Sequence, residues 1–236
     1  MLAVVDASRD RVLANLDTIR SRIASAAARA DRPPESITLV AAAKTVSVER
    51  VRWVLEAGVT AIGENYVQEL RDARAGLAGI GCRWHYIGAL RSSTAHHVAD
   101  LCDVVETVAG EHAARRLAGR CARAGRTIDV LLEVDFTGER AGLVPADVPA
   151  FADLVASLEG LRLRGLMTIP PLTPTAGEAR PWFARLRELR DGVRENHPDV
   201  LDLSMGMSLD YEVAVEEGAT MVRIGTALFG VRNAVT

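Results

Sequence analysis

The chain has 236 residues, of which 49% are hydrophobic and 25% are charged, and its formal net charge at pH 7 is −3. This length and apolar content suffice for one substantial core, so we expect a single domain over residues 1–236. The near balance of 28 Lys+Arg against 31 Asp+Glu argues against a nucleic-acid-binding protein. No apolar run approaches the roughly 20 residues that cross a bilayer, so no membrane segment is expected.

The cysteines indicate the compartment. Cys82, Cys102 and Cys121 are odd in number, have no CxxC spacing and follow no signal peptide. The pattern predicts a cytoplasmic protein in a reducing environment, without a disulfide framework and without a metal site.

Repeated strand and helix patterns follow one long N-terminal helix. That amphipathic helix is expected from Asp6 to Ala30, where apolar residues recur at steps of three and four. Eight short apolar strands are then predicted, at Ile37–Ala43, Ala61–Gly63, Trp84–Gly88, Asp103–Val108, Ile128–Val134, Leu163–Thr168, Leu201–Ser204 and Met221–Ile224. The intervening helices are expected to open near Ser47, Asn65, Ser92, Gly110, Pro145, Ala176 and Ser208.

The strict alternation of strand and helix predicts a parallel sheet with right-handed crossovers. Eight such units favour an α/β fold made of a single closed (β/α)₈ TIM barrel with an extra N-terminal helix. An open doubly wound sheet is the alternative, although no GxGxxG fingerprint follows the first strand to support it. In a barrel the chemistry lies at the carboxyl ends of the strands.

Lys44 stands at such an end. It closes the apolar run "ITLVAAA", which reads as a buried strand, and an ammonium group is costly to bury without a function. A lysine whose charged end merely reaches solvent from a strand end is the alternative reading.

The last two strand ends predict a phosphate site. "MGMS" and "IGT" supply glycines for close backbone approach and the hydroxyls of Ser208 and Thr226, and barrels often bind phosphate with these two loops. A lysine that can take an aldehyde and loops that can take a phosphate together predict pyridoxal 5'-phosphate (PLP) as the cofactor.

Five segments carry a resemblance to a known family: "VAAAKTVSVERV", "GENYVQE", "WHYIGALRS", "GLMTIPP" and "LSMGMSLDYEVAVEEGATMVRIGTALFG". Together they resemble the YggS/PROSC family of PLP-binding proteins, which is related to the N-terminal barrel domain of alanine racemase. The resemblance covers the chain from the first strand to the C-terminus. It implies a monomeric PLP homeostasis protein with little or no turnover, acting as a carrier or buffer that serves apo PLP-enzymes.

The resemblance also implies roles for individual residues. Lys44 matches the lysine that holds PLP as an internal aldimine, and Arg223 matches an arginine near the pyridine nitrogen. Ser208, Gly225 and Thr226 match the phosphate-binding positions, whereas Asn65 and His85 match positions that line the pocket. A cation beside the pyridine nitrogen keeps that nitrogen unprotonated, which makes the ring a weaker electron sink.

Two loops depart from the family pattern. "ALRSST" at Ala89–Thr94 replaces a segment that usually resembles His-Leu-Gln-Ser-Asn-Lys, and Asp135–Gly142 is shorter than its usual counterpart. Both border the expected pocket mouth, so we expect cofactor binding to persist while the contacts that these loops make with partners differ.

Two other functions stay open at the level of sequence. One is a PLP-dependent amino-acid racemase, favoured by the shared barrel and by tyrosines near the strand ends; but alanine racemases take a second acid/base group from a further domain, and this chain ends at Thr236. The other is a phosphosugar-binding barrel without a cofactor, in which Lys44 is a base or a Schiff-base lysine.

Overall fold

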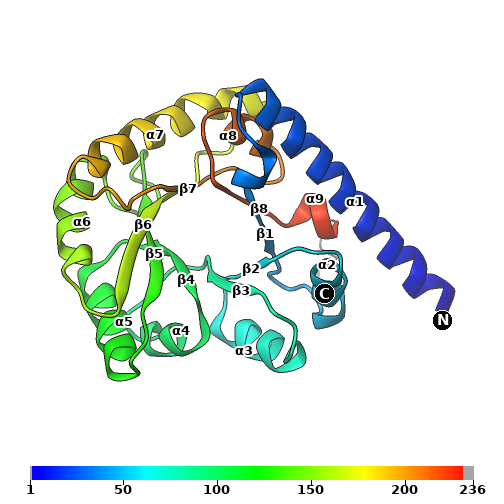
Figure 1. Ribbon diagram of the computed structural model, residues 1–236, viewed down its shortest axis with the longest axis horizontal. Coiled ribbons are helices and arrows are strands. Elements are labelled where there is room, and N and C mark those ends of the chain that lie inside the picture. The colour runs from blue at the N-terminus through cyan, green and yellow to red at the C-terminus, as the bar shows by residue number, and fades with distance from the viewer. Residues whose placement is uncertain (1, 231–236) are drawn as a thin grey trace.

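The computed structural model of the chain describes residues 2–230, and these form a closed barrel of eight parallel strands in the order β1 to β8 (Figure 1). The strands are β1 (Thr38–Ala42), β2 (Ala61–Glu64), β3 (Arg83–Tyr86), β4 (Val104–Val108), β5 (Ile128–Val134), β6 (Leu161–Thr168), β7 (Asp202–Ser204) and β8 (Met221–Ile224). Because β1 pairs with β8, the barrel prediction is confirmed and the open sheet is excluded.

Helices surround the barrel. They are α1 (Leu2–Arg29), α2 (Val48–Glu56), α3 (Val67–Gly76), α4 (Ala95–Leu101), α5 (Glu111–Arg123), α6 (Val148–Ala156), α7 (Arg180–Arg194), α8 (Tyr211–Glu216) and the short α9 (Thr226–Phe229). Two of the expected helix starts, Pro145 and Ala176, open a turn of 3₁₀-helix that precedes the α-helix. No helix among the described residues combines the length and apolarity needed to cross a membrane.

The extra N-terminal helix α1 lies outside the ring, against α2, α8 and α9 (Figure 1). Its apolar stripe at Val12, Leu16, Ile19 and Ile23 is buried, as its helical spacing predicts. Asn15 Nδ2 donates a hydrogen bond to the carbonyl of Leu228, 3.0 Å away, which attaches α1 to the end of the barrel that carries α9.

The barrel interior consists of layers, because alternate residues of each strand point inward. The middle layer is apolar and contains Val40, Ala61, Val104, Leu131, Met167 and Met221. Two positions further along β4 and β8, Glu106 and Arg223 belong to a polar layer nearer the carboxyl ends of the strands.

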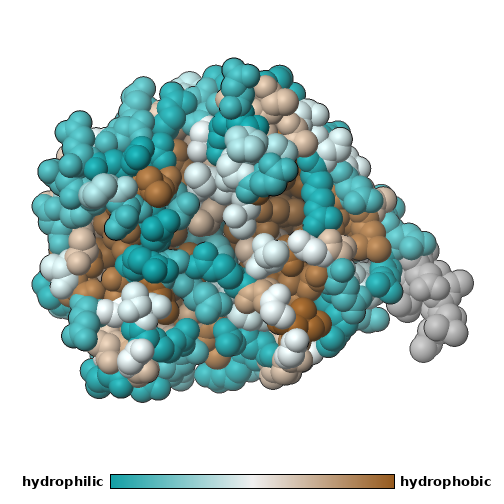
Figure 2. All heavy atoms as spheres, in the orientation of Figure 1, coloured by the Kyte–Doolittle hydropathy of each residue, from teal (hydrophilic) through white to brown (hydrophobic). Residues whose placement is uncertain are grey.

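The opposite end of the barrel is closed by an ion-pair cluster. Asp129 lies two residues before Leu131 on β5 and accepts hydrogen bonds from Arg83 Nη2 at 2.5 Å and from Arg162 Nε at 2.6 Å. The outer margin of the face in Figure 2 is mostly hydrophilic, with hydrophobic atoms visible between the polar side chains.

The buried polar residues Glu106 and Arg223 lie nearer the carboxyl ends of the strands than the apolar layer does. A functional site is therefore expected at the carboxyl end of the barrel.

Gly206, after β7, provides a test of this packing. Its φ of +90° lies in the region that favours glycine, and a Cβ there would lie 2.5 Å from the Cβ of Ala214. We expect Gly206→Ala to lower the free energy of unfolding by about 2–4 kcal/mol, measured by urea denaturation. Gly192→Ala, on the exposed face of α7 with no atom near its Cβ, should change it by at most about +1 kcal/mol. Equal stability of the two variants would contradict the packing described.

Candidate functional site

A cavity of about 590 Å³ opens at the carboxyl ends of the strands. Six of the residues predicted from the sequence line it: Lys44, Asn65, Ser208, Arg223, Gly225 and Thr226. The loop after β6 supplies an apolar wall that includes Ile169, Pro170 and Pro171. A cavity of this size falls in the range of small-molecule and cofactor sites.

Lys44 enters the cavity from a strained turn. β1 ends at Ala42, and the next turn places Thr45 at a φ of +60°, which is unusual for a β-branched residue. The Lys44 ammonium lies 5.1 Å from the centre of the Tyr66 ring, and it makes no ion pair with any residue in the 2–230 range. The amine is thus presented to the cavity with an aromatic neighbour and without a competing carboxylate.

Two carboxyl groups lie behind this turn. The backbone N–H of Thr45 donates to Glu69 Oε2 at 3.3 Å, and Glu69 is close to the buried Glu64 at the end of β2. Burial, and secondarily the charge of Glu69, raise the pKa of Glu64 to about 8. Glu64 is therefore protonated at neutral pH, so that the lysine turn is backed by one carboxylate instead of two.

The loops after β7 and β8 are joined by Ser208. Its hydroxyl accepts a hydrogen bond from the backbone N–H of Ala227 at 3.0 Å. Ser208 is not the N-cap of the next helix, because α8 begins at Tyr211 and the backbone N–H of Met207 donates to Asp210 Oδ1 at 2.6 Å. The predicted phosphate residues thus lie on two loops held side by side at one end of the cavity.

Arg223 forms the floor of the cavity, and a buried network extends below it. Arg223 Nη1 donates to Ser204 Oγ at 2.5 Å, and Ser204 Oγ donates to Glu106 Oε2 at 2.6 Å. His85 Nδ1 lies 2.6 Å from Glu106 Oε1. The structure therefore places His85 in this network beneath the floor. The resemblance implied that His85 lines the cavity, but it is not among the lining residues.

The charges around the cavity are mainly positive. Lys44, Arg140 and Arg223 line it, and Asp210 is its one acidic side chain among the described residues. Burial raises the pKa of Asp210 despite the hydrogen bond from Met207. An excess of cations in a partly enclosed cavity favours an anionic ligand.

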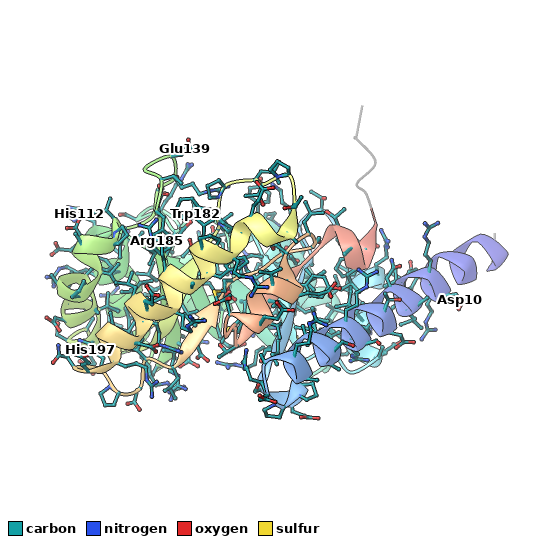
Figure 3. All side chains as sticks on the ribbon, turned by 90° about the horizontal axis from the view of Figure 1, so that it is seen from above. Asp10, His112, Glu139, Trp182, Arg185 and His197 are labelled. Atoms are coloured by element: carbon teal, nitrogen blue, oxygen red, sulfur yellow. The ribbon has the colours of Figure 1, made fainter. Side chains whose placement is uncertain are left out.

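The loop over residues 135–142 brings Arg140 to the cavity. Asp135 fixes the loop by accepting hydrogen bonds from the backbone N–H groups of Thr137, at 2.8 Å, and of Arg140, at 2.7 Å. Figure 3 shows Glu139 at the far tip of this loop, with Trp182 and Arg185 of α7 near its base. The Arg185 guanidinium lies 4.6 Å from the ring centre of Phe136, so α7 holds the loop by a cation–π contact.

The segment just before the loop over residues 89–94 reaches the site, whereas the loop itself does not border the pocket mouth as expected from the sequence. Ile87 lines the cavity, and its carbonyl oxygen lies 3.5 Å from Asn65 Nδ2, while the hydroxyl of Tyr86 donates to the carbonyl of Ala89 at 3.4 Å. Residues 89–94 are not among those that line the cavity.

Sequence reasoning did not find Glu69, Glu106, Arg140, Ser204 or Asp210. Glu106 had a local signal, since it is the one charged residue in the apolar strand "VVETV". The others carry no sequence signal, because their relation to the cavity arises only when distant strands and loops meet.

A family model and two curated relatives match nearly the whole chain. Residues 14–233 match the family described as "Alanine racemase, N-terminal domain". The chain is 40% identical to the "Pyridoxal phosphate homeostasis protein" of Pseudomonas aeruginosa over 93% of this chain and 95% of that protein. It is 37% identical to the protein of the same name from Aquifex aeolicus, over 92% and 97%.

Solved structures show the same fold. PipY of Synechococcus elongatus PCC7942, solved with PLP bound, is 36% identical, with a TM-score of 0.80 over 90% of this chain and all of PipY. Alanine racemase of Clostridium difficile 630 matches with a TM-score of 0.73 but at 16% identity, and this chain covers 57% of it. The second comparison establishes the fold alone.

Glu64 predicts a pH dependence of stability. Its pKa is raised from 4.5 to about 8 in the folded protein, so the free energy of unfolding should fall as pH rises between these values and then level off. Glu64→Gln, which carries no charge, should melt several degrees above the wild type at pH 8.5 and show a smaller difference at pH 5. Each pKa unit corresponds to about 1.4 kcal/mol, and each kcal/mol to about 2–4 °C.

The measurement is thermal denaturation across this pH range without added ligand. Glu188→Gln, on the exposed face of α7, is the matched control and should follow the wild type at every pH. A Glu64→Gln curve that runs parallel to the wild type would refute the assignment.

Proposed function

The chain belongs to the alanine racemase N-terminal domain family and, within it, to the pyridoxal phosphate homeostasis proteins, and from this premise we propose that it binds PLP on Lys44. We further propose that it acts as a carrier or buffer in intracellular PLP homeostasis, with little or no turnover of its own. The observation that carries the proposal is a lysine without an ion-pair partner among residues 2–230, in a cationic cavity with two hydroxyl- and glycine-bearing loops.

The residues of the cavity fit the cofactor. PLP supplies an aldehyde that condenses reversibly with amines and a phosphate that carries negative charge. The Lys44 amine would take the aldehyde, while Ser208, Gly225 and Thr226 would hold the phosphate. A Cβ on Gly225 would lie 3.1 Å from the carbonyl oxygen of Ala42, so a larger residue there would be crowded where the two loops approach β1.

Arg223 supports the expectation of low turnover. Its guanidinium is a buried cation at the cavity floor, and a ring nitrogen placed against a cation stays unprotonated. A ring in that state withdraws electrons weakly, so carbanions formed next to it gain little stabilisation. The cavity therefore suits storage of the cofactor better than catalysis with it.

A PLP-dependent racemase is less well supported. It needs a second acid/base group opposite the lysine, but the hydroxyl of Tyr86 is engaged by Ala89, and Tyr211 is buried away from the cavity wall. Tyr66 lies near Lys44 and is half exposed, which makes it the remaining tyrosine candidate among the described residues. Exchange of the α-proton of single L-amino acids in deuterated water at a useful rate would favour the racemase.

The same proposal includes a monomer that gives PLP to apo-enzymes in the cytoplasm. The open cavity mouth supports direct transfer, since exposed apolar side chains of Leu172 and Leu209 surround it. The thiols of Cys82, Cys102 and Cys121 are free, which is compatible with a reducing compartment.

We expect transfer of PLP from the loaded protein to an apo-enzyme to be faster than spontaneous release. The assay follows recovery of activity of a PLP-free aminotransferase, with a large excess of a PLP-trapping amine in a parallel reaction to measure release alone. The rate should rise with the concentration of apo-enzyme. A rate equal to release at every concentration would refute the carrier role and leave PLP binding intact.

A further inference from the structure

The strongest feature outside the residues assigned to the cofactor is the chain of polar contacts beneath it. His85, Glu106, Ser204 and Arg223 come from β3, β4, β7 and β8, and all four are at least 96% buried. Their side chains form one connected network that extends below the cavity lined by Arg223.

Hydrogen bonds connect the four side chains in series. Ser204 Oγ accepts from Arg223, so its own proton goes to Glu106 Oε2. Glu106 Oε1 lies 2.6 Å from His85 Nδ1, so both carboxyl oxygens of Glu106 have a partner. Although burial opposes ionisation, the hydrogen bond and electrostatic attraction of His85, the charge of Arg223 and the hydrogen bond from Ser204 keep the pKa of Glu106 below its usual value.

His85 Nε2 is buried and has no hydrogen-bond partner in the described part of the chain. On its other side the network links the buried Glu106 carboxylate to the buried Arg223 guanidinium through Ser204, which is the arrangement that burial tolerates.

Glu106 differs from the other acids that face Arg223. Glu133 on β5 and Asp210 also act on it through their charge, as does the like-charged Arg140. Glu133 makes no side-chain hydrogen bond within residues 2–230, and Asp210 is engaged by the N–H of Met207. Glu106 alone among these acids is joined to Arg223 by hydrogen bonds, through Ser204.

We propose that Glu106 is a positioning residue, which through Ser204 holds the Arg223 guanidinium as an oriented cation at the floor of the PLP pocket. Arg223 Nη2 also donates to the carbonyl of Thr168 at 2.9 Å. Two N–H bonds are therefore directed into the barrel, which fixes the plane of the guanidinium and the face that it presents to the cavity. This inference rests on the proposed PLP function and adds a determinant of cofactor affinity and electronic state.

The test compares Glu106→Gln with Glu133→Gln in the full-length protein. Glu106→Gln keeps the side-chain size but removes the charge, and we expect its Kd for PLP to rise at least about tenfold, with a displaced absorption maximum of the bound cofactor. Glu133→Gln makes the same change beside Arg223 without breaking the network, so its Kd should change less than about threefold. Equal effects of the two variants would mean a general field effect and would overturn the positioning role.

A Ser204 variant tests the same connection independently. It also keeps the proposal testable if Glu106→Gln does not fold. Ser204→Ala removes only the connecting hydroxyl, and PLP affinity should fall with it. If Ser204 acts by connecting Glu106 to Arg223, the double variant should bind PLP no more weakly than Glu106→Gln alone. Wild-type Kd and spectrum in Ser204→Ala, or effects that simply add in the double variant, would overturn the connection.

If Glu106 only stabilises the fold, its variant gives a different result. Glu106→Gln would then lower Tm, while the Kd for PLP and the spectrum of the folded fraction stay as in the wild type. That outcome would overturn the inference. Failure of the wild type to bind PLP would instead refute the proposed function, so the two failures are distinguishable.

Discussion

The parallel pairing of β1 with β8 is the interaction on which the site depends. It closes the barrel, with Val40 opposite Arg223 and Ala41 opposite Ile224. Lys44 and Thr226, which follow these strands, therefore emerge side by side although 182 positions separate them in the sequence (226 − 44). A shift of one residue in this register would turn Arg223 out of the barrel, because neighbouring residues of a strand face opposite sides.

The barrel interior combines this closure with a change of polarity along its axis. The apolar middle layer supplies burial and stability, while the layer above it accepts ionised groups that are expensive to bury unless paired. The opposite charges of Glu106 and Arg223, joined by hydrogen bonds through Ser204, offset the free-energy cost of burying them. The site thus has a buried, charged floor beneath the loops that form its mouth.

Much of the fold could be predicted because short apolar strands and helices alternate throughout the chain. Lys44 could be identified from its place after an apolar run, and the two glycine-containing strand ends indicated the phosphate loops. His85 could be placed on an inward-facing strand end but not at the right depth, because depth depends on how the strands are staggered in the barrel. Ser204 and Asp210 could not be identified, since their partners belong to other strands and loops.

The measurement that tests the account most directly is the visible spectrum of the purified protein with added PLP, followed by borohydride reduction and peptide mass mapping. We expect an absorption band that borohydride abolishes, with the label on Lys44, and the loss of both in Lys44→Ala. Lys44 is the single lysine of the sequence, so no band, or label found at any position other than Lys44, would contradict its assignment and favour a phosphate-binding barrel without this cofactor.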